Sequence, residues 1–258
     1  MKKILLLLCC ISILNCKKEQ QKNNTLIAEE LPKNIVAKIT PINHATTVVE
    51  FDKEIMYIDP TGGKEAFINF NAPSYVLITD IHGDHMNIKT LEELNLSSSK
   101  VIAPKAVADR IQNIKCKELI VMNNSNRKIF SNFMVEAIPM YNLRKEALRF
   151  HKKGRGNGYV LTIGKERIYF SGDTEDIPEM RALKNSDIAF VCMNLPYTMT
   201  VESAASAVLD FKPKQVYPYH YRGTKGLSDI GKFKDIVNDA NPEIKVIQLD
   251  WYPNRDSK

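Results

Sequence analysis

The sequence predicts an α+β fold in which two β-sheets pack together and helices cover their outer faces. Short apolar runs rich in β-branched residues open the body of the chain, strand and helix patterns then alternate, and the same succession occurs a second time. The length of 258 residues suits one large domain or two small ones. No internal linker rich in Gly, Ser or Pro divides it, so we expect a single domain.

The composition excludes several classes of protein. Hydrophobic residues make up 44% and charged residues 26% of the chain, which is typical of a folded protein rather than a disordered one. The 11 Gly and 12 Pro are scattered, which excludes a collagen-like repeat. The 36 basic and 30 acidic side chains are intermingled, with a net charge of +6 and no dense Lys/Arg stripe. We therefore expect no nucleic-acid partner.

Residues 1–16 are predicted to form a lipoprotein signal peptide. Two lysines precede an apolar run over residues 4–14, which is too short for a membrane-spanning helix of about 20 residues but fits a signal-peptide core. The following Leu14-Asn15-Cys16 resembles a bacterial lipobox, although Asn15 departs from the usual small residue. We expect a lipid on Cys16 and export to the periplasmic side of a membrane or to the cell surface. An ordinary secretory signal and a buried N-terminal strand are the alternatives.

The mature chain is predicted to consist of a polar tether and a folded domain. Residues 17–34 begin with the polar stretch KKEQQKNN and are expected to form the tether, and residues 35–252 to form the domain. Besides Cys16, only Cys116 and Cys192 would remain after cleavage. Two distant cysteines do not make a disulfide framework, so we expect two small buried thiols.

The first half of the domain should begin with antiparallel strands and continue with strand–helix alternation. Strands are predicted at residues 35–42, 46–51, 54–59, 75–79, 101–104 and 119–122, and helices at residues 88–96 and 104–113. The second half repeats the succession. Its strands are predicted at residues 133–140, 159–164, 167–172, 187–193, 216–220 and 246–250, and its helices at residues 201–211 and 229–238.

Four possible metal ligands fall within six residues, directly after the predicted buried strand 75–79. The segment reads TDIHGDH and supplies Asp80, His82, Asp84 and His85. Loops at strand ends project side chains into clefts, and imidazole with carboxylate is the donor set expected for zinc, iron or manganese. A single Asp or His is usually solvated or caps a turn. Four together, in a chain with 5 His, predict a metal site.

Three further residues fit the same site. Asp173 lies in SGDT after a predicted strand, and His220 follows the strand VYPY. His151 precedes the loop KKGRGNG, whose glycines allow close backbone approach. The structural alternatives are a turn-forming Asp and half-buried imidazoles.

These residues are where the chain resembles the metallo-β-lactamase superfamily. That superfamily carries a Thr-His-x-His-x-Asp-His loop, a distant His, an Asp in a Gly-Asp-Thr turn and a late His. The resemblance covers residues 35–250 and implies a four-layer αββα sandwich with metals at one edge, between the two sheets. Within the superfamily the chain looks most like predicted zinc-dependent hydrolases related to the ascorbate-6-phosphate lactonases.

The resemblance also implies two sets of ligands. One metal would take Asp80, His82 and His151, the other Asp84, His85 and His220, and Asp173 would bridge them. Two zinc ions per chain are the expected cofactor. Asp80 stands where the superfamily usually has its first His, and its hard oxygen shifts the preference of that site toward Mn²⁺ or Fe²⁺.

Five other residues are candidates for supporting roles. The resemblance places His44 near the cleft, either contacting a ligand or facing the substrate, with a purely structural role the alternative. Asp59, at the end of a predicted strand, could brace a ligand imidazole through its N–H. Tyr197, Tyr219 and Tyr221 are candidates for the pocket wall, with ordinary packing the alternative for each.

The expected function is hydrolysis of a small-molecule ester, lactone or phosphodiester by a metal-bound hydroxide. Two ions ~3.5–4 Å apart lower the pKa of a bridging water toward ~7, and Asp84 is the candidate for moving its proton. A di-iron redox protein and a non-catalytic metal-binding scaffold are the alternatives. Hydrolysis of β-lactams is less favoured, because Asp80 and the GRGNGY and NLPYTM segments look more like the lactonase-related branch.

Overall fold

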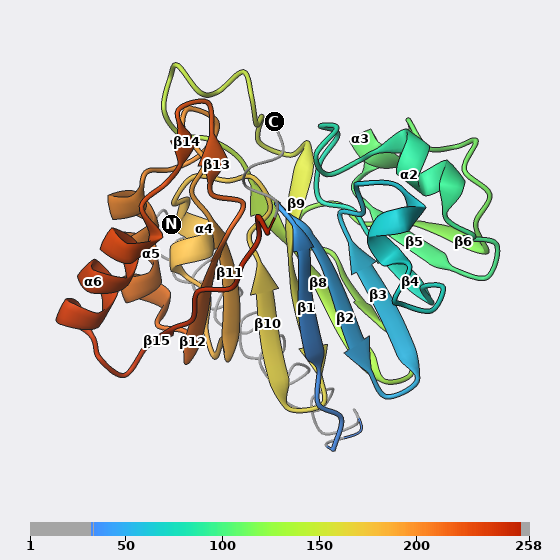
Figure 1. Ribbon diagram of the computed structural model, residues 1–258, viewed down its shortest axis with the longest axis horizontal. Helices are drawn as coiled ribbons and strands as arrows, with labels where there is room; N and C mark the ends of the chain where they lie inside the picture. The colour runs from blue at the N-terminus through green and yellow to red at the C-terminus, as the bar shows by residue number, and fades with distance from the viewer. Residues whose placement is uncertain (1–31, 33, 254–258) are drawn as a thin grey trace, which may run out of the picture.

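A computed structural model describes residue 32 and residues 34–253. The predicted signal peptide lies outside the described residues, and so does the predicted tether except Pro32 and Asn34. The domain contains a six-stranded and a seven-stranded sheet. Figure 1 shows α4, α5 and α6 beside the seven-stranded sheet and α2 and α3 beside the six-stranded one, so the predicted αββα sandwich is confirmed.

The six-stranded sheet comes from the first half of the domain, in sequence order. Its strands are β1 (Lys38–Asn43), β2 (Thr46–Phe51), β3 (Glu54–Ile58), β4 (Tyr75–Leu77), β5 (Lys100–Ala103) and β6 (Glu118–Val121). The first three form the predicted antiparallel meander, and β3 to β6 pair in parallel. The parallel crossovers contain the 3₁₀ helix η1 (Lys64–Phe67), α2 (Ile88–Glu93) and α3 (Lys105–Ala108).

The seven-stranded sheet is built from the second half and has the order β15-β12-β11-β10-β9-β8-β7. Its strands are β7 (Arg127–Ile129), β8 (Phe133–Met140), β9 (Gly156–Ile163), β10 (Glu166–Phe170), β11 (Ile188–Cys192), β12 (Gln215–Tyr219) and β15 (Lys245–Val246). Helices α4 (Pro178–Arg181), α5 (Val201–Phe211) and α6 (Ile230–Ala240) connect its parallel strands, and β13 (Arg222–Gly223) and β14 (Gly226–Leu227) form a separate hairpin.

The helix starts of α5 and α6 follow from the sequence. The side chain of Thr200 accepts a hydrogen bond from the Ser203 N–H, and that of Asp229 accepts one from the Lys232 N–H. Each cap satisfies a backbone donor that has no partner inside its helix. The predicted helix 201–211 matches α5, and the predicted helix 229–238 matches α6 to within two residues.

The core explains why residues 75–78 are all apolar. Leu77 packs in the main core between the two sheets, with Phe133 and Leu161 of the facing sheet. Val76 and Ile78 point to the opposite side and pack in a second cluster that includes Leu91 of α2 and Val107 of α3. Because successive strand residues face opposite sides, a strand covered on both faces needs apolar residues at every position.

The structure differs from the sequence predictions in local detail. The helix expected at residues 104–113 ends after one turn at Ala108, because the next amides bond to carbonyls three residues back, as Arg110 does to Val107. The hairpin β13–β14 and helix α4 were not predicted. Cys192 is buried as expected, but Cys116 is only partly buried. In the part of the chain that the structure describes, every helix is too short or too polar to cross a bilayer.

Candidate metal centre

The seven predicted ligands converge at one edge of the sandwich. The loop 79–85 follows β4, Asp173 follows β10, His220 follows β12, and His151 lies just before β9. Their donor atoms form two groups, each with all atoms within 4.8 Å of one another. The Asp84 group contains Asp84, His85, Asp173 and His220, and the Asp80 group contains Asp80, His82 and His151. The structure thus places together residues up to 140 positions apart in the sequence.

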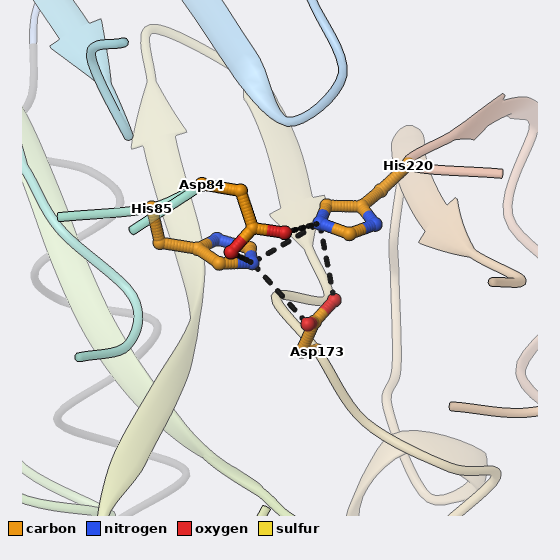
Figure 2. Close-up of side chains that lie close together, drawn as sticks. All are labelled: Asp84, His85, Asp173 and His220. Atoms are coloured by element: carbon orange, nitrogen blue, oxygen red, sulfur yellow. Dashed lines mark hydrogen bonds and ion pairs between the residues drawn. The ribbon is translucent and has the colours of Figure 1, made fainter. Parts of the chain in front are cut away.

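The Asp84 group is compact and mostly buried (Figure 2). Nε2 of His85 and Nε2 of His220 face each other at 3.1 Å. The carboxylate of Asp173 lies below both rings, with Oδ2 at 3.3 Å from His85 Nε2 and Oδ1 at 3.5 Å from His220 Nε2. Asp84 closes the group from the solvent side, with Oδ2 at 3.4 Å from His220 Nε2.

These separations fit a bound divalent ion. Donor atoms at the usual 2.0–2.2 Å from a tetrahedral zinc ion lie about 3.3 Å from one another. Two imidazole nitrogens that face each other, each with a carboxylate beside it, can both bind one metal ion. In the absence of a metal ion they can face each other only if a proton lies between them. Asp173 Oδ1 is buried and accepts no hydrogen bond from the described residues. The donor set and its spacing therefore suit a divalent ion such as zinc, iron or manganese.

The imidazole of His85 is held from behind by Asp59. Asp59 Oδ2 lies 2.7 Å from His85 Nδ1, which confirms that Asp59 braces an imidazole of the site. The carboxylate of Asp59 is itself fixed by the backbone N–H of Thr79 at 2.8 Å and by the Thr79 hydroxyl at 2.6 Å. All three side chains are buried. Nε2 of His85 is thereby directed at the other members of the Asp84 group.

The charges of the group are strongly coupled. Burial alone would lower the pKa of His85, but the nearby carboxylates, Asp173 foremost, raise it well above its usual value. Burial alone would raise the pKa of Asp173, but the charges of His220, His85 and His151 hold it well below the usual range. The pKa of Asp84 is lowered in the same way, chiefly by His85. Both carboxylates are therefore ionised at neutral pH.

The Asp80 group differs, because a positive side chain already contacts it. Nδ1 of His82 lies 2.9 Å from Asp80 Oδ2. Arg155 donates to both oxygens of Asp80, from Nε to Oδ1 at 3.0 Å and from Nη2 to Oδ2 at 2.7 Å. Burial would raise the pKa of Asp80, but His82 and Arg155 lower it below its usual value. Arg155 was not singled out from the sequence. Asp80 stands where the superfamily usually has a His, and a buried carboxylate needs a positively charged partner. This substitution is the sequence signal from which a partner such as Arg155 could have been predicted.

Asp173 lies between the two groups. Its Oδ2 is 3.3 Å from Nε2 of His85 and 3.1 Å from Nε2 of His151. His151 in turn places Nδ1 3.2 Å from the carbonyl of Tyr197. Asp173 is therefore the carboxylate positioned to contact ions in both groups.

His44 contacts the Asp84 group from the side. Its ring lies against that of His220, tilted by 32° with 3.7 Å between centroids, and its Nε2 lies 3.4 Å from Asp84 Oδ2. The hydroxyl of Tyr252, a residue that the sequence did not indicate, is 2.6 Å from His44 Nδ1. Burial, with the charge of His220, lowers the pKa of His44 to about 4, so the ring is neutral at pH 7.

Two glycines allow the strand ends to approach one another. A Cβ on Gly156 would lie 2.9 Å from the Thr79 carbonyl oxygen and 3.2 Å from Asp80 Oδ1. Gly172, directly before Asp173, has φ +59 and would place a Cβ 2.5 Å from Met140 Sδ. The close approach expected from the loop KKGRGNG is therefore present at Gly156.

The three candidate tyrosines have different positions. Tyr219 and Tyr221 are buried in the main core, and the Tyr219 hydroxyl accepts a hydrogen bond from the Gly172 N–H at 2.8 Å. Tyr219 therefore supports the residue before Asp173 from the core side, and Tyr221 packs against Tyr252. Tyr197 is partly exposed.

Comparison with known proteins agrees with this geometry. Residues 62–221 match the family described as the beta-lactamase superfamily domain. A UPF0173 metal-dependent hydrolase of Pyrococcus horikoshii is 30% identical over 79% of this chain and 93% of its own. A crystal structure of a metal-dependent hydrolase from Parabacteroides distasonis has a TM-score of 0.74 and 36% identity, covering 82% of this chain and 92% of that one. The chain belongs to the metallo-β-lactamase superfamily, and it is a hydrolase of that fold.

A more distant structure shows what else this fold can carry. A diiron β-hydroxylase from Streptomyces venezuelae has a TM-score of 0.66 and 15% identity, covering 83% of this chain and 53% of that one. At this identity the likeness concerns the fold alone.

Proposed function

We propose that this protein is a zinc-dependent hydrolase that cleaves an ester, lactone or phosphodiester bond of a small molecule at the Asp84 group. The observation that carries the proposal is the approach of His85 Nε2 and His220 Nε2 to 3.1 Å, with Asp84 and Asp173 beside them. Relatives named as metal-dependent hydrolases support the reaction class.

Asp59, Asp173 and Asp84 have different roles in the proposed reaction. Asp59 fixes the orientation of His85, and the buried Asp173 supplies negative charge between the two groups. A divalent ion bound by the Asp84 group would polarise the substrate oxygen and lower the pKa of an attacking water. We assign Asp84 the transfer of the proton, because its side chain is 43% exposed, unlike the other members of the group, so its ionised carboxylate borders the solvent from which the attacking water comes.

A cavity of about 960 Å³ offers room for the rest of the substrate. Its walls include Phe70, Arg222 and Tyr252. Tyr252 hydrogen-bonds to His44, and His44 contacts Asp84. His44 therefore connects this wall of the cavity to the Asp84 group. The Arg222 guanidinium lies 4.8 Å from the centre of the Tyr252 ring. If the cavity binds the substrate, Arg222→Gln raises KM with little change in kcat.

The proposal is tested by metal analysis coupled to a substrate screen. The purified domain is assayed for zinc and iron and then tested on lactones, phosphodiesters, thioesters and nitrocefin. We expect turnover of at least one substrate, abolished by a chelator and restored by zinc. Coloured protein with about two irons per chain would instead favour the di-iron redox alternative. Metal-loaded protein that cleaves no substrate in the panel would favour a binding scaffold.

We also propose that Cys16 anchors the protein to a membrane of the bacterial cell envelope. The support is the sequence of residues 1–16, with its two lysines, short apolar run and lipobox-like end. Radiolabelled palmitate should be incorporated into the full-length protein and not into Cys16→Ser. Equal labelling of both would contradict the anchor.

A further inference from the structure

The guanidinium of Arg155 is fixed against Asp80. The Asp80 side chain is buried, and both of its oxygens accept hydrogen bonds from Arg155, at 3.0 and 2.7 Å. Nη2 of Arg155 also donates to the carbonyl of Phe150. A planar guanidinium that meets a carboxylate through two parallel bonds is a strong and geometrically defined pair. Asp80 is therefore neutralised by the protein itself.

The backbone holds Arg155 in this position. The next residue, Gly156, passes so close to Thr79 and Asp80 that a Cβ there would lie 2.9 Å from the Thr79 carbonyl oxygen and 3.2 Å from Asp80 Oδ1. One residue further, the N–H of Asn157 donates to the Thr79 carbonyl at 3.0 Å. The start of β9 is thus held against Thr79 and Asp80, and the backbone of Arg155 cannot move away from Asp80 without breaking this contact.

The position of Arg155 conflicts with a metal ion in the Asp80 group. Asp80 Oδ2, the oxygen nearest to His82 Nδ1, is the one bound by Arg155 Nη2. The same Nη2 lies 3.4 Å from Nε2 of His82. A divalent ion bound by these two side chains would lie beside the guanidinium and be repelled by its charge.

The Asp84 group has no such competitor. In residues 34–253, no lysine or arginine forms an ion pair with Asp84 or Asp173. Their partners are His44, His85, His151 and His220. The two groups, both built from imidazole and carboxylate donors, therefore differ in whether a positively charged side chain contacts them.

We infer that Arg155 takes the place of a second metal ion, so that the protein carries one tightly bound ion, in the Asp84 group, beside a fixed guanidinium in the Asp80 group. This inference rests on the proposed function, because it assumes that the Asp84 group binds zinc. It differs from the sequence-based expectation of two zinc ions per chain. The opposing possibility is that Arg155 orients Asp80 as a ligand, and it predicts the opposite effect of removing Arg155.

The test is the zinc stoichiometry of the wild-type protein and of Arg155→Gln. Each is incubated with excess zinc, desalted and analysed by mass spectrometry of the metal against protein concentration. We expect about one zinc per chain in the wild type and about two in Arg155→Gln, with the affinity for the second ion raised at least about tenfold. Arg110→Gln, at an exposed position, is the matched control and should stay at one.

Two further measurements keep the inference falsifiable if Arg155→Gln does not fold. The wild type titrated with Co²⁺ should show visible absorption that saturates at one equivalent. Asp80→Asn should keep the zinc content of the wild type, because Asp80 is not a ligand of the tightly bound ion. Two tightly bound ions in the wild type, or loss of zinc in Arg155→Gln or Asp80→Asn, would overturn the inference and leave the proposed function standing. A wild type that binds no zinc would overturn both.

Discussion

Asp59 Oδ2 lies 2.7 Å from Nδ1 of His85, while Nε2 of the same ring faces Asp173 and His220. Both side chains are buried, and Asp59 comes from the end of β3, 26 positions earlier in the chain. The contact selects which ring nitrogen of His85 is free and where it points. The Asp84 group is therefore oriented by a carboxylate that is not itself one of its members.

Replacing Asp59 should weaken zinc binding without removing a ligand. Asp59→Asn keeps the shape of the side chain but loses the charge that supports His85, and we expect zinc affinity to fall about 10- to 100-fold. Competition with a chromogenic chelator measures the change. Asp239→Asn, an exposed substitution on α6, is the control. Unchanged affinity in Asp59→Asn would show that the contact does not support metal binding.

Zinc uptake should release a proton from His85. The carboxylates around His85 raise its pKa well above 6.5, so the ring is protonated at neutral pH before the ion enters. The ion must displace this proton, and zinc affinity therefore rises with pH, by up to about tenfold per unit. Calorimetric titrations at pH 7 in two buffers of different ionisation enthalpy count the protons released. Identical heats in both buffers would contradict the prediction.

The same pKa shift sets the direction of a stability change in the metal-free protein. A proton that His85 holds more tightly when folded stabilises the fold fully below pH 6.5, and this stabilisation is lost as pH rises through the folded-state pKa. Denaturant midpoints measured from pH 6 upward should fall more steeply for the metal-free protein than for the zinc-loaded one. Parallel curves would show that the proton on His85 does not stabilise the fold.

Gly156 should tolerate no side chain. A Cβ there would meet Met140 Cε at 2.2 Å and the Thr79 carbonyl oxygen at 2.9 Å, and we expect Gly156→Ala to lower the free energy of unfolding by about 1–3 kcal/mol. Gly83 lies in the loop 79–85, which Gly156 approaches, but has open space around it, so Gly83→Ala is the control and should change stability little. Equal unfolding free energies for the two variants would contradict the steric argument.

The arrangement of the sheets could be predicted from the sequence, and the grouping of the seven candidate ligands from the resemblance to the metallo-β-lactamase superfamily. Strand ends carry Asp173 and His220 as expected, and the TDIHGDH loop follows a strand that is apolar because both faces are covered. These features depend on local patterns and on a motif with fixed spacing.

The contacts of Arg155 and Tyr252 could not be predicted in the same way. Arg155 is 75 positions from Asp80 and Tyr252 is 208 positions from His44, so each pair depends on how two distant loops meet. Nothing in the periodicity around either residue marks it. The short α3 was mispredicted for a related reason, because the apolar spacing up to Ile111 is satisfied by turns as well as by a helix.

The central claim is that hydrolysis requires an ion held by the Asp84 group, and Asp173→Ala tests it most directly. Asp173 contacts His85, His220 and His151, so its removal takes a ligand from the group while leaving the three imidazoles in place. Zinc content and turnover are measured on the same folded sample, with Gly83→Ala as control. We predict that Asp173→Ala loses both together. Retained turnover in protein that has lost its zinc would contradict the account.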